Sequence, residues 1–436
     1  MIAAMRATWV LFFGIGLMML GNGLQGTLLG VRATLEDFDT AVTGIMMSGY
    51  FAGFFLGSLI VPRLLRNVGH VRIFSALSAL ASSSILLHAV LVDPWFWTLM
   101  RLVTGFCYAG MYIVSESWLN ERAENANRGA MLSAYMIVMQ SGMAGGQFLL
   151  GAGDPQGLGL FIIVSVLVSL AVVPMLVSTG PMPRFEEIER LSVRRVARGS
   201  PLAAVGTLLT GMTAAIILGI GPVYGVSIGL SVGQVALFMG VISLGVIVLQ
   251  VPIGTLSDRF DRRTVLMVVA FASAGVAAVA ALVGGSGSIW ILLVVSGIFG
   301  GLALPIYALC NAHLNDFLET RHMVSGSATL LLIFGLGSVI GPSLAAGAMS
   351  AFGDSAFFWL ISLIHVLIGV FALYRMTQRA AVPLEDQGPY LAMSPRSTAV
   401  AQTAWVDSEL VEEDGEEEQA GGENGDPAPA ASTTGG

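Results

Sequence analysis

The stretch at residues 101–120 constrains the fold more than any other part of the chain. It is apolar enough to lie in a lipid bilayer, yet it carries an arginine, two tyrosines and a glutamate. At 100° per residue, these side chains and one glycine fall on a single stripe of a helix, namely Arg101, Gly105, Tyr108, Tyr112 and Glu116. A charge in hydrocarbon is costly, so the stripe is expected to face other helices or water rather than lipid.

Two interpretations of this stripe stay open at the level of the sequence. In the first, the helix lines a polar cavity inside a membrane protein. In the second, the stripe is a structural set of buried polar groups that binds helices together. Ionisable groups within a membrane mark functional sites by default, so we expect the cavity.

The composition places most of the chain in a membrane. Of its 436 residues, 55% are hydrophobic and 11% are charged, whereas a soluble protein carries about 25% charged residues. Residues 380–436 hold twelve acids and one arginine, so their net charge of −11 turns a body of +3 into a chain of −8. The two cysteines, Cys107 and Cys310, lie in apolar runs, which argues against a disulfide framework or a zinc site. We expect no metal, no cofactor and no nucleic-acid partner.

Twelve apolar segments are long enough to span a bilayer, at about 20 residues each. We expect them at residues 8–30, 41–62, 71–92, 95–118, 130–151, 158–178, 203–228, 233–253, 264–284, 287–311, 324–350 and 356–375. The chain is therefore predicted to be an all-α membrane protein. The first segment is over twenty residues long and lacks a small-residue cleavage site, so we do not expect a cleaved signal peptide.

Arginines mark one side of this predicted protein. Fourteen lie in the loops after segments 2, 4, 6, 8 and 10, and four more lie near the two termini. The loops after the odd-numbered segments contain only Arg32. By the positive-inside rule, both termini and the arginine-bearing loops are expected on the cytoplasmic side of the plasma (inner) membrane.

Four regions follow from this pattern. Residues 1–179 and 202–379 are expected to form two six-helix bundles. Residues 180–201 are expected to be a cytoplasmic linker whose middle can form a short amphipathic helix on the membrane surface. Residues 380–436 have the composition of a disordered acidic tail. The tail is either a solvated segment that the main activity does not need or a segment for regulation or partner binding.

The two halves of the chain repeat each other. Under a shift of 195 residues, polar and small residues coincide: Gly105 with Gly300, Tyr112 with Tyr307, Asn120 with Asn315, Gly142 with Gly337 and Gly146 with Gly341. A shift of 197 residues aligns Gly57 with Gly254. An even number of spans in each half makes this a parallel repeat, related by an axis along the membrane normal.

The loop after segment 8 reads GTLSDRFDRR, residues 254–263. It resembles the cytoplasmic loop motif of the major facilitator superfamily, a Gly-x-Leu-x-Asp-Arg pattern followed by basic residues. The aspartate can cap a helix end or pair with an arginine, and the arginines suit a helix C-terminus and anionic lipid. The resemblance implies a conformational latch at Gly254, Asp258, Arg259, Arg262 and Arg263. The first-half copy, residues 57–72, lacks the aspartate.

Further stretches carry the same resemblance. Arg101-x-x-x-Gly105 is similar to a motif of proton-linked members, and GLGSVIGPSLAAG in segment 11 resembles the family's Gly-Pro helix motif. A finer resemblance, over nearly all of residues 1–379, is to the YcaD-like branch of the superfamily, and Glu116-Ser117 and Gly146-Gln147 are among its matching stretches. It implies the major facilitator fold, two pseudo-symmetric bundles of six helices, and it implies transport without naming a cargo.

In this family, segments 1, 4, 7 and 10 line a central cavity. The resemblance therefore implies a set of polar and aromatic substrate-cavity residues: Asn22, Gln25, Arg101, Tyr108, Tyr112, Tyr224, Tyr307 and Asn311. Segment 7 also contains GIGPVYG, and a Gly/Pro interruption in a span indicates a gate or a site. For the lone Asn, Gln and Tyr residues, hydrogen bonding between helices is the alternative role.

Arg101 and Glu116 are about 22 Å apart along a helix axis and cannot pair directly. Arg101 is expected toward the external end, where it attracts an anionic group of the cargo or pairs with an acid from elsewhere. Glu116 is expected near the cytoplasmic end, where it exchanges protons with that side. Alternatively, Glu116 bonds helix ends or a loop arginine at the interface.

These features bear on three functions. The first is a monomeric secondary transporter that moves a small molecule, coupled to protons, across the lipid bilayer by alternating access. The second is a sensor or scaffold that acts through the acidic tail. The third, an intramembrane enzyme, lacks a constellation of acids, metal ligands or a nucleophile elbow, and no nucleotide-binding loop indicates a primary pump. We expect the transporter.

Overall fold

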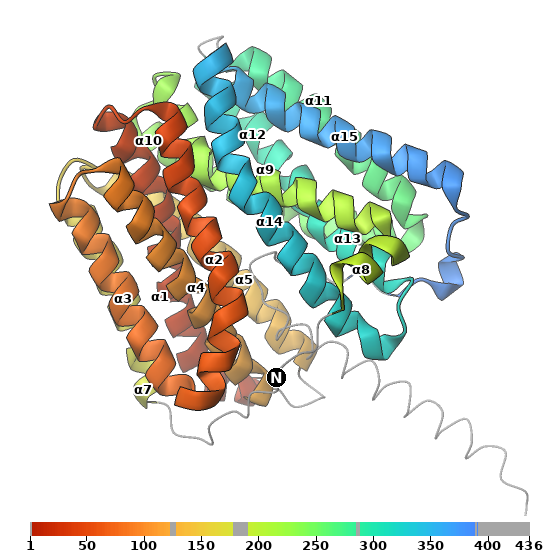
Figure 1. Ribbon diagram of the computed structural model, residues 1–436, viewed down its shortest axis with the longest axis horizontal. Helices are drawn as coiled ribbons and strands as arrows, with labels where there is room; N and C mark the ends of the chain where they lie inside the picture. Colours follow the sequence, from red (N-terminus) through yellow and green to blue (C-terminus); the bar gives the residue numbers. More distant parts are fainter. Residues whose placement is uncertain (1, 123–127, 178–190, 285–287, 389, 391–436) are drawn as a thin grey trace, which may run out of the picture.

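The chain is an all-α membrane protein. Its computed structural model describes residues 2–122, 128–177, 191–284, 288–388 and 390 (Figure 1). Its first half contains α1 (Ile2–Leu35), α2 (Thr40–Val68), α3 (His70–Val90), α4 (Pro94–Arg122), α5 (Arg128–Leu149), η2 (Leu150–Ala152), α6 (Gly159–Leu170) and α7 (Val173–Val177). Its second half contains α9 (Pro201–Ser227), α10 (Val232–Arg259), α11 (Arg262–Val283), α12 (Ile289–Ala303), α13 (Ile306–Asn315), α14 (Thr320–Phe352), α15 (Ala356–Gln378) and η3 (Leu384–Asp386).

Each of the twelve predicted segments coincides with a helix or with two consecutive helices. Segment 6 is divided into α6 and α7, and segment 10 is divided into α12 and α13 with Pro305 at the N-cap of α13. In the described part of the chain, nine of these spans are long and apolar enough to cross a membrane. Residues 180–190 of the predicted linker and residues 391–436 of the tail lie outside the described residues, and α8 (Val193–Gly199) lies in the second half of the linker.

Glycines allow paired helices to touch backbone to backbone in the first half. A Cβ atom on Gly105 of α4 would lie 1.9 Å from the carbonyl oxygen of Tyr50 in α2. A Cβ atom on Gly53 of α2 would lie 1.9 Å from the carbonyl oxygen of Leu102 in α4. These distances are far below van der Waals contact, so α2 and α4 can approach this closely only because both positions are glycine.

The second half uses the same contact between α10 and α12. A Cβ atom on Gly300 would lie 2.3 Å from the carbonyl oxygen of Ile242, and one on Gly245 would lie 2.0 Å from that of Gly297. Gly105 and Gly300, which coincide in the repeat, therefore occupy equivalent places in the two bundles. The pair of Gly146 and Gly341 behaves alike, since they face the backbones of α1 and α9 respectively.

The packing corrects one alignment of the repeat. Gly105 faces Tyr50 and Gly300 faces Ile242, so α2 and α10 are related by a shift of 192 residues. The starts of α3 and α11, at residues 70 and 262, differ by the same number. The shift of 197 that paired Gly57 with Gly254 therefore does not describe the structure, because Pro62 is the counterpart of Gly254.

The helices define two ends of the molecule. At the arginine-rich end, α2, α4, α10 and α13 finish near Arg66 and Arg259. At the opposite end, which we call the arginine-poor end, α1, α3, α9 and α11 finish. The two halves meet near the arginine-poor end, where the Ser48 and Ser343 hydroxyl oxygens of α2 and α14 lie 2.9 Å apart. Gly30 and Gly44 add close contacts of α1 and α2 with Pro222 in α9 and with α14.

Candidate functional site

A cleft lies between the two halves, on the arginine-rich side of the contact between Ser48 and Ser343. Paired helices contribute opposite walls, since Ser58 of α2 and Leu331 of α14 both line it, as do Gln140 of α5 and Gln250 of α10. Its empty space, including the part that is open to solvent, is about 1050 Å³. The remaining walls are mostly aromatic or aliphatic: Tyr50, Phe51, Phe54, Phe55, Met143, Ala214, Leu218, Val246, Leu304, Pro305 and Phe334.

A smaller and more polar pocket adjoins this cleft, and the two share Tyr50, Phe51, Met143 and Leu218. Its other lining residues come from α1, α4 and α5: Asn22, Gly23, Gly26, Thr27, Arg101 and Gln147. We call it the polar pocket. It places Arg101 of α4 next to the central cleft.

Arg101 is buried in the polar pocket, with an exposed fraction of 3%. Its guanidinium carbon lies 4.5 Å from the centre of the Tyr50 ring, a cation–π contact. Its Nε and Nη1 atoms make no hydrogen bond to any residue that the structure describes. The ion pairs found among those residues also leave Arg101 out.

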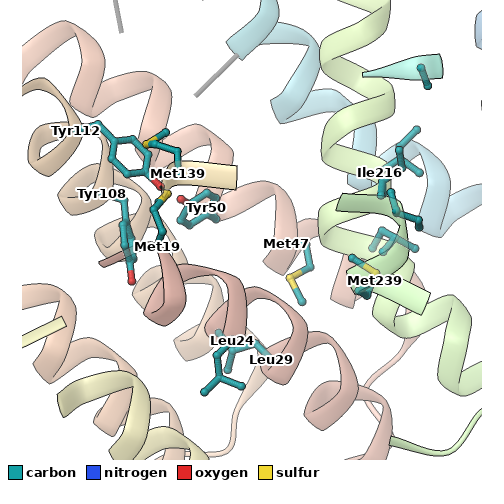
Figure 2. Packing of buried hydrophobic residues seen from close by; sticks show 14 of the residues in the cluster. Met19, Leu24, Leu29, Met47, Tyr50, Tyr108, Tyr112, Met139, Ile216 and Met239 are labelled. Atoms are coloured by element: carbon teal, nitrogen blue, oxygen red, sulfur yellow. Dashed lines mark hydrogen bonds between the residues drawn. The ribbon is translucent and has the colours of Figure 1, made fainter. Parts of the chain in front are cut away.

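Hydrogen bonds hold the other polar side chains of this region in place. The Asn22 amide nitrogen donates to the Tyr112 hydroxyl at 2.7 Å and lies 3.1 Å from the Tyr50 hydroxyl. The Tyr108 ring stands 6.2 Å from the rings of both Tyr50 and Tyr112, so the three tyrosines form one aromatic layer (Figure 2). Gln147 accepts a hydrogen bond from Ser243 of α10 at 2.7 Å, which joins the two halves.

The predicted cavity residues are spread over several environments. Asn22 and Arg101 line the polar pocket, while Tyr108 and Tyr112 form the layer behind Tyr50 and Asn22. Gln25 is buried in α1.

The predicted residues of the second half lie behind its cleft wall or away from it. Tyr307 packs against the wall residue Phe334, with ring centres 5.2 Å apart, and Asn311 is buried in α13. Tyr224 instead stacks on Phe357 of α15 at 4.6 Å, so the interruption in segment 7 places its aromatic ring between α9 and α15.

Glu116 lies inside the first bundle, between α4 and α5. It is fully buried and accepts a hydrogen bond from the Tyr135 hydroxyl at 2.6 Å. It lies on α4 toward the arginine-rich end, and it lines neither the cleft nor the polar pocket.

Arg262 is the centre of the predicted latch. It is buried and forms an ion pair with Asp316, which follows α13. It also donates to the carbonyl oxygens of Ala312 and Gly388, at 3.0 and 2.6 Å, and to the Ser257 hydroxyl at 3.1 Å. Burial raises the pKa of Asp316 to about 6, and the adjacent guanidinium acts in the opposite direction.

The other latch residues surround this ion pair within the second half. Asp258 lies 3.7 Å from Arg262, and Arg263 pairs with Asp261 at 3.1 Å. Gly254 faces the ring of Tyr390, and Arg259 is exposed. In the described residues, therefore, the partners of Arg262 come from α10, α13 and the segment after α15.

Sequence reasoning missed several residues of the site. Tyr50 and the phenylalanines of α2 appeared only as part of an apolar segment, although Tyr50 joins the cleft to the polar pocket. Asp316 had a signal in the repeat, because the shift of 195 aligns it with the carboxylate of Glu121. Among the residues that the structure describes, no group of three or more His, Cys, Asp or Glu side chains could hold a metal ion.

Comparison with known sequences gives one family. The Major Facilitator Superfamily model matches residues 11–205 and 203–407. The MFS-type transporter YE1530 of Yersinia enterocolitica is 28% identical over 402 residues, which cover 90% of this chain and 100% of that protein. The MFS-type transporter YcaD of Escherichia coli is 26% identical over 365 residues, which cover 83% and 94%.

Solved structures share the fold at low sequence identity. The nucleoside transporter NupG matches with a TM-score of 0.72 and 11% identity, over 86% of this chain and 100% of that one. A bacterial homologue of the human lysosomal transporter Spinster, in an inward-facing conformation, matches with a TM-score of 0.70 and 15% identity, over 88% of this chain and 99% of that one. A D-xylose–proton symporter matches with a TM-score of 0.65 and 14% identity, over 84% of this chain and 96% of that one.

Replacing Arg262 by alanine is expected to destabilise the protein by about 3–5 kcal/mol, because Asp316 would be left buried without its ion-pair partner. The matched control is Arg259→Ala. Arg259 lies three residues before Arg262 and its side chain is exposed, so this variant should leave the unfolding temperature unchanged. Thermal unfolding of both variants in detergent measures the difference. Equal stability of the two variants would contradict the structural role of Arg262.

Proposed function

Because the chain belongs to the major facilitator superfamily, we propose that it is a secondary active transporter, not an enzyme, and that it moves a small solute by alternating access. The observation that carries the proposal is the cleft between two bundles of the same design. Its walls combine aromatic side chains with a few convergent polar groups, a composition typical of small-molecule sites. The relatives named above are transporters of the same superfamily.

We further propose that the arginine-rich end faces the cytoplasm, in the plasma (inner) membrane, with both termini on that side. The positive-inside rule supports this orientation. The cleft then opens toward the cytoplasm and the contact between Ser48 and Ser343 closes the external side. The similarity to a structure described as inward-facing is consistent with this state.

Close packing within each half supports rocking as the motion. The glycine contacts hold α2 to α4 and α10 to α12 at the backbone level. The halves meet near the arginine-poor end, where Ser48 and Gly44 of α2 contact Ser343 and its neighbours in α14. Two rigid bundles that separate at one end and meet at the other expose a central site to each side in turn.

Proton coupling is the finer part of the proposal, and we assign it to Glu116. A buried carboxylate that accepts a hydrogen bond from a tyrosine can hold or release a proton as its surroundings change. Glu116 belongs to the same helix as Arg101, so a change of its charge acts on the helix that borders the polar pocket. A sensor or scaffold that acts through the tail is the alternative, and no observation in the described residues favours it.

A disulfide across the closed end tests alternating access. The substrate is first identified by mass spectrometry of proteoliposome contents after incubation with a metabolite mixture. In the variant Ser48→Cys with Ser343→Cys, oxidation should then abolish transport and reduction should restore it, because the cross-link holds the external side shut. The native cysteines are buried, which keeps them out of the cross-linking reaction. The single variants Ser48→Cys and Ser343→Cys serve as controls. Full flux through the oxidised double variant would reject the mechanism.

The variant Glu116→Gln tests the proton-coupling residue. It should remove the pH dependence of flux or the accumulation driven by a pH gradient, because an amide cannot take up the proton. Glu121→Gln is the matched control, since Glu121 is exposed on the same helix. A Glu116→Gln protein with the wild-type pH profile would show that Glu116 does not carry the proton.

A further inference from the structure

We infer that the polar pocket is an anion-binding site and that the solute is an organic anion with an apolar body. That the anion is transported rests on the proposed function, whereas its binding is argued from the geometry of the pocket alone. Arg101 supplies the charge at one end of the combined cavity, and the cleft supplies the apolar surroundings at the other.

The charge of Arg101 has no counter-ion among the described residues. Its neighbours with titratable side chains are Tyr50, Tyr108 and His88, and none of them is a carboxylate. A cation–π contact with Tyr50 offsets part of the cost of burial, but two guanidinium nitrogens are left without hydrogen bonds. A buried charge needs a partner, so the missing negative charge is expected on the ligand.

The chemical group that the polar pocket fits follows from Arg101 and the residues beside it. The pocket that contains Arg101 also contains Asn22 and Gln147, whose side-chain amides can orient a small polar group. Guanidinium forks match a carboxylate in two parallel hydrogen bonds, and Nε and Nη1 of Arg101 have no acceptor among the described residues. The polar pocket therefore fits a carboxylate or a group of similar shape and charge.

The body of the ligand is set by the adjoining cleft. Phe51 borders both spaces, and the walls beyond it include Phe54, Phe55 and Phe334. Such walls favour apolar or aromatic groups and offer little to a sugar or a polyol. The combined site thus selects an amphipathic anion, a carboxylate attached to an apolar or aromatic group, over a neutral polar metabolite.

Two measurements on the purified full-length protein test the site. Calorimetry in nanodiscs, with empty discs subtracted, compares acetate, benzoate and 1-naphthoate with their neutral amides. Affinity should rise along the acids, and 1-naphthoate should bind at least tenfold tighter than 1-naphthamide. Arg101→Met should abolish the preference for the acid, and Arg101→Lys should retain part of it. Without ligand, Arg101→Met should raise the unfolding temperature, because it removes an uncompensated buried charge.

Each other outcome overturns the inference. Wild-type protein that binds acids and amides equally, or binds none of them, has no anion site of this kind. A fall in the unfolding temperature of Arg101→Met would mean that the guanidinium already has a partner in the protein. Failure of the transport proposal looks different, because proteoliposomes would then show no flux while the acid preference in binding persists.

A separate observation supports a second inference, on the segment that follows α15. We propose that residues 379–388 and 390, which we call the C-terminal strap, hold the arginine-rich end in its open state. The Tyr390 backbone N–H donates to Asp258 at 2.8 Å. The carbonyl oxygens of Gly388 and Arg379 accept from Arg262 and Arg263, at 2.6 and 2.7 Å. The strap thus engages three of the residues that the family motif supplies.

The Tyr390 ring fills a place that a moving helix would need. It covers Gly254 in the last turns of α10, where an added Cβ would lie 2.4 Å from a ring carbon. It also packs against the buried cluster that contains Ala214 and Phe334, two residues that line the cleft. The ring thus occupies the arginine-rich end of the cleft wall of the second half, and its release leaves that space free when the two bundles rock together.

Spin labels across the cleft test the strap. Exposed residues Ser133 on α5 and Leu256 on α10 are replaced by labelled cysteine, and double electron–electron resonance measures their distance in nanodiscs. Tyr390→Ala should increase the population with a short distance at the arginine-rich end. Tyr374→Ala, an exposed tyrosine of α15, is the matched control and should match the wild type. An unchanged distribution in Tyr390→Ala, or an equal change in both variants, would reject the proposal.

Discussion

Backbone contact between paired helices is the constraint on which the rest of the structure depends. Lipid chains are as apolar as leucine, so burial of apolar surface gives little reason for two helices to pair in a membrane, and close packing has to provide it. Gly53 and Gly105 let α2 and α4 touch at their main chains, and Gly245 and Gly300 do the same for α10 and α12. Each half is therefore a closely packed unit, and the cleft lies between the two units on the arginine-rich side of their contact.

The same packing decides where polar side chains can lie. Gly105 of α4 faces the backbone of α2. Arg101 lies one turn before it on α4, against the ring of Tyr50 from α2. The glycine contact thus carries the arginine into the space between α1, α2 and α4 and away from lipid. An arginine on another face of α4 would have to reach the membrane surface to stay solvated.

The helices and the repeat were predictable because each depends on local sequence. Apolar length predicts a span, and glycines at equal spacing predict equal contacts, as Gly105 and Gly300 show. The site was less predictable, because helical periodicity fixes a face but not the neighbour that the face meets. Tyr224 shows this limit: its Gly/Pro surroundings suggested the cavity, yet its ring packs between α9 and α15. The counter-charge of Arg262 came from Asp316, fifty-four residues later, which only the folded chain brings close.

The places where the two halves differ separate binding from architecture. Under the shifts that the packing supports, Arg101 corresponds to Ser296, and Arg262 corresponds to His70. His70 shares a hydrogen bond with the Ser117 hydroxyl of α4, and Arg262 donates to the Ala312 carbonyl oxygen of α13, so a polar side chain holds this place in both halves and a permanently charged one in the second. Arg262 has its carboxylate inside the protein, whereas Arg101 has none among the described residues. Since a buried cation needs a partner, Arg262 stabilises the fold through Asp316, and the proposed partner of Arg101 is the anionic group of a bound ligand.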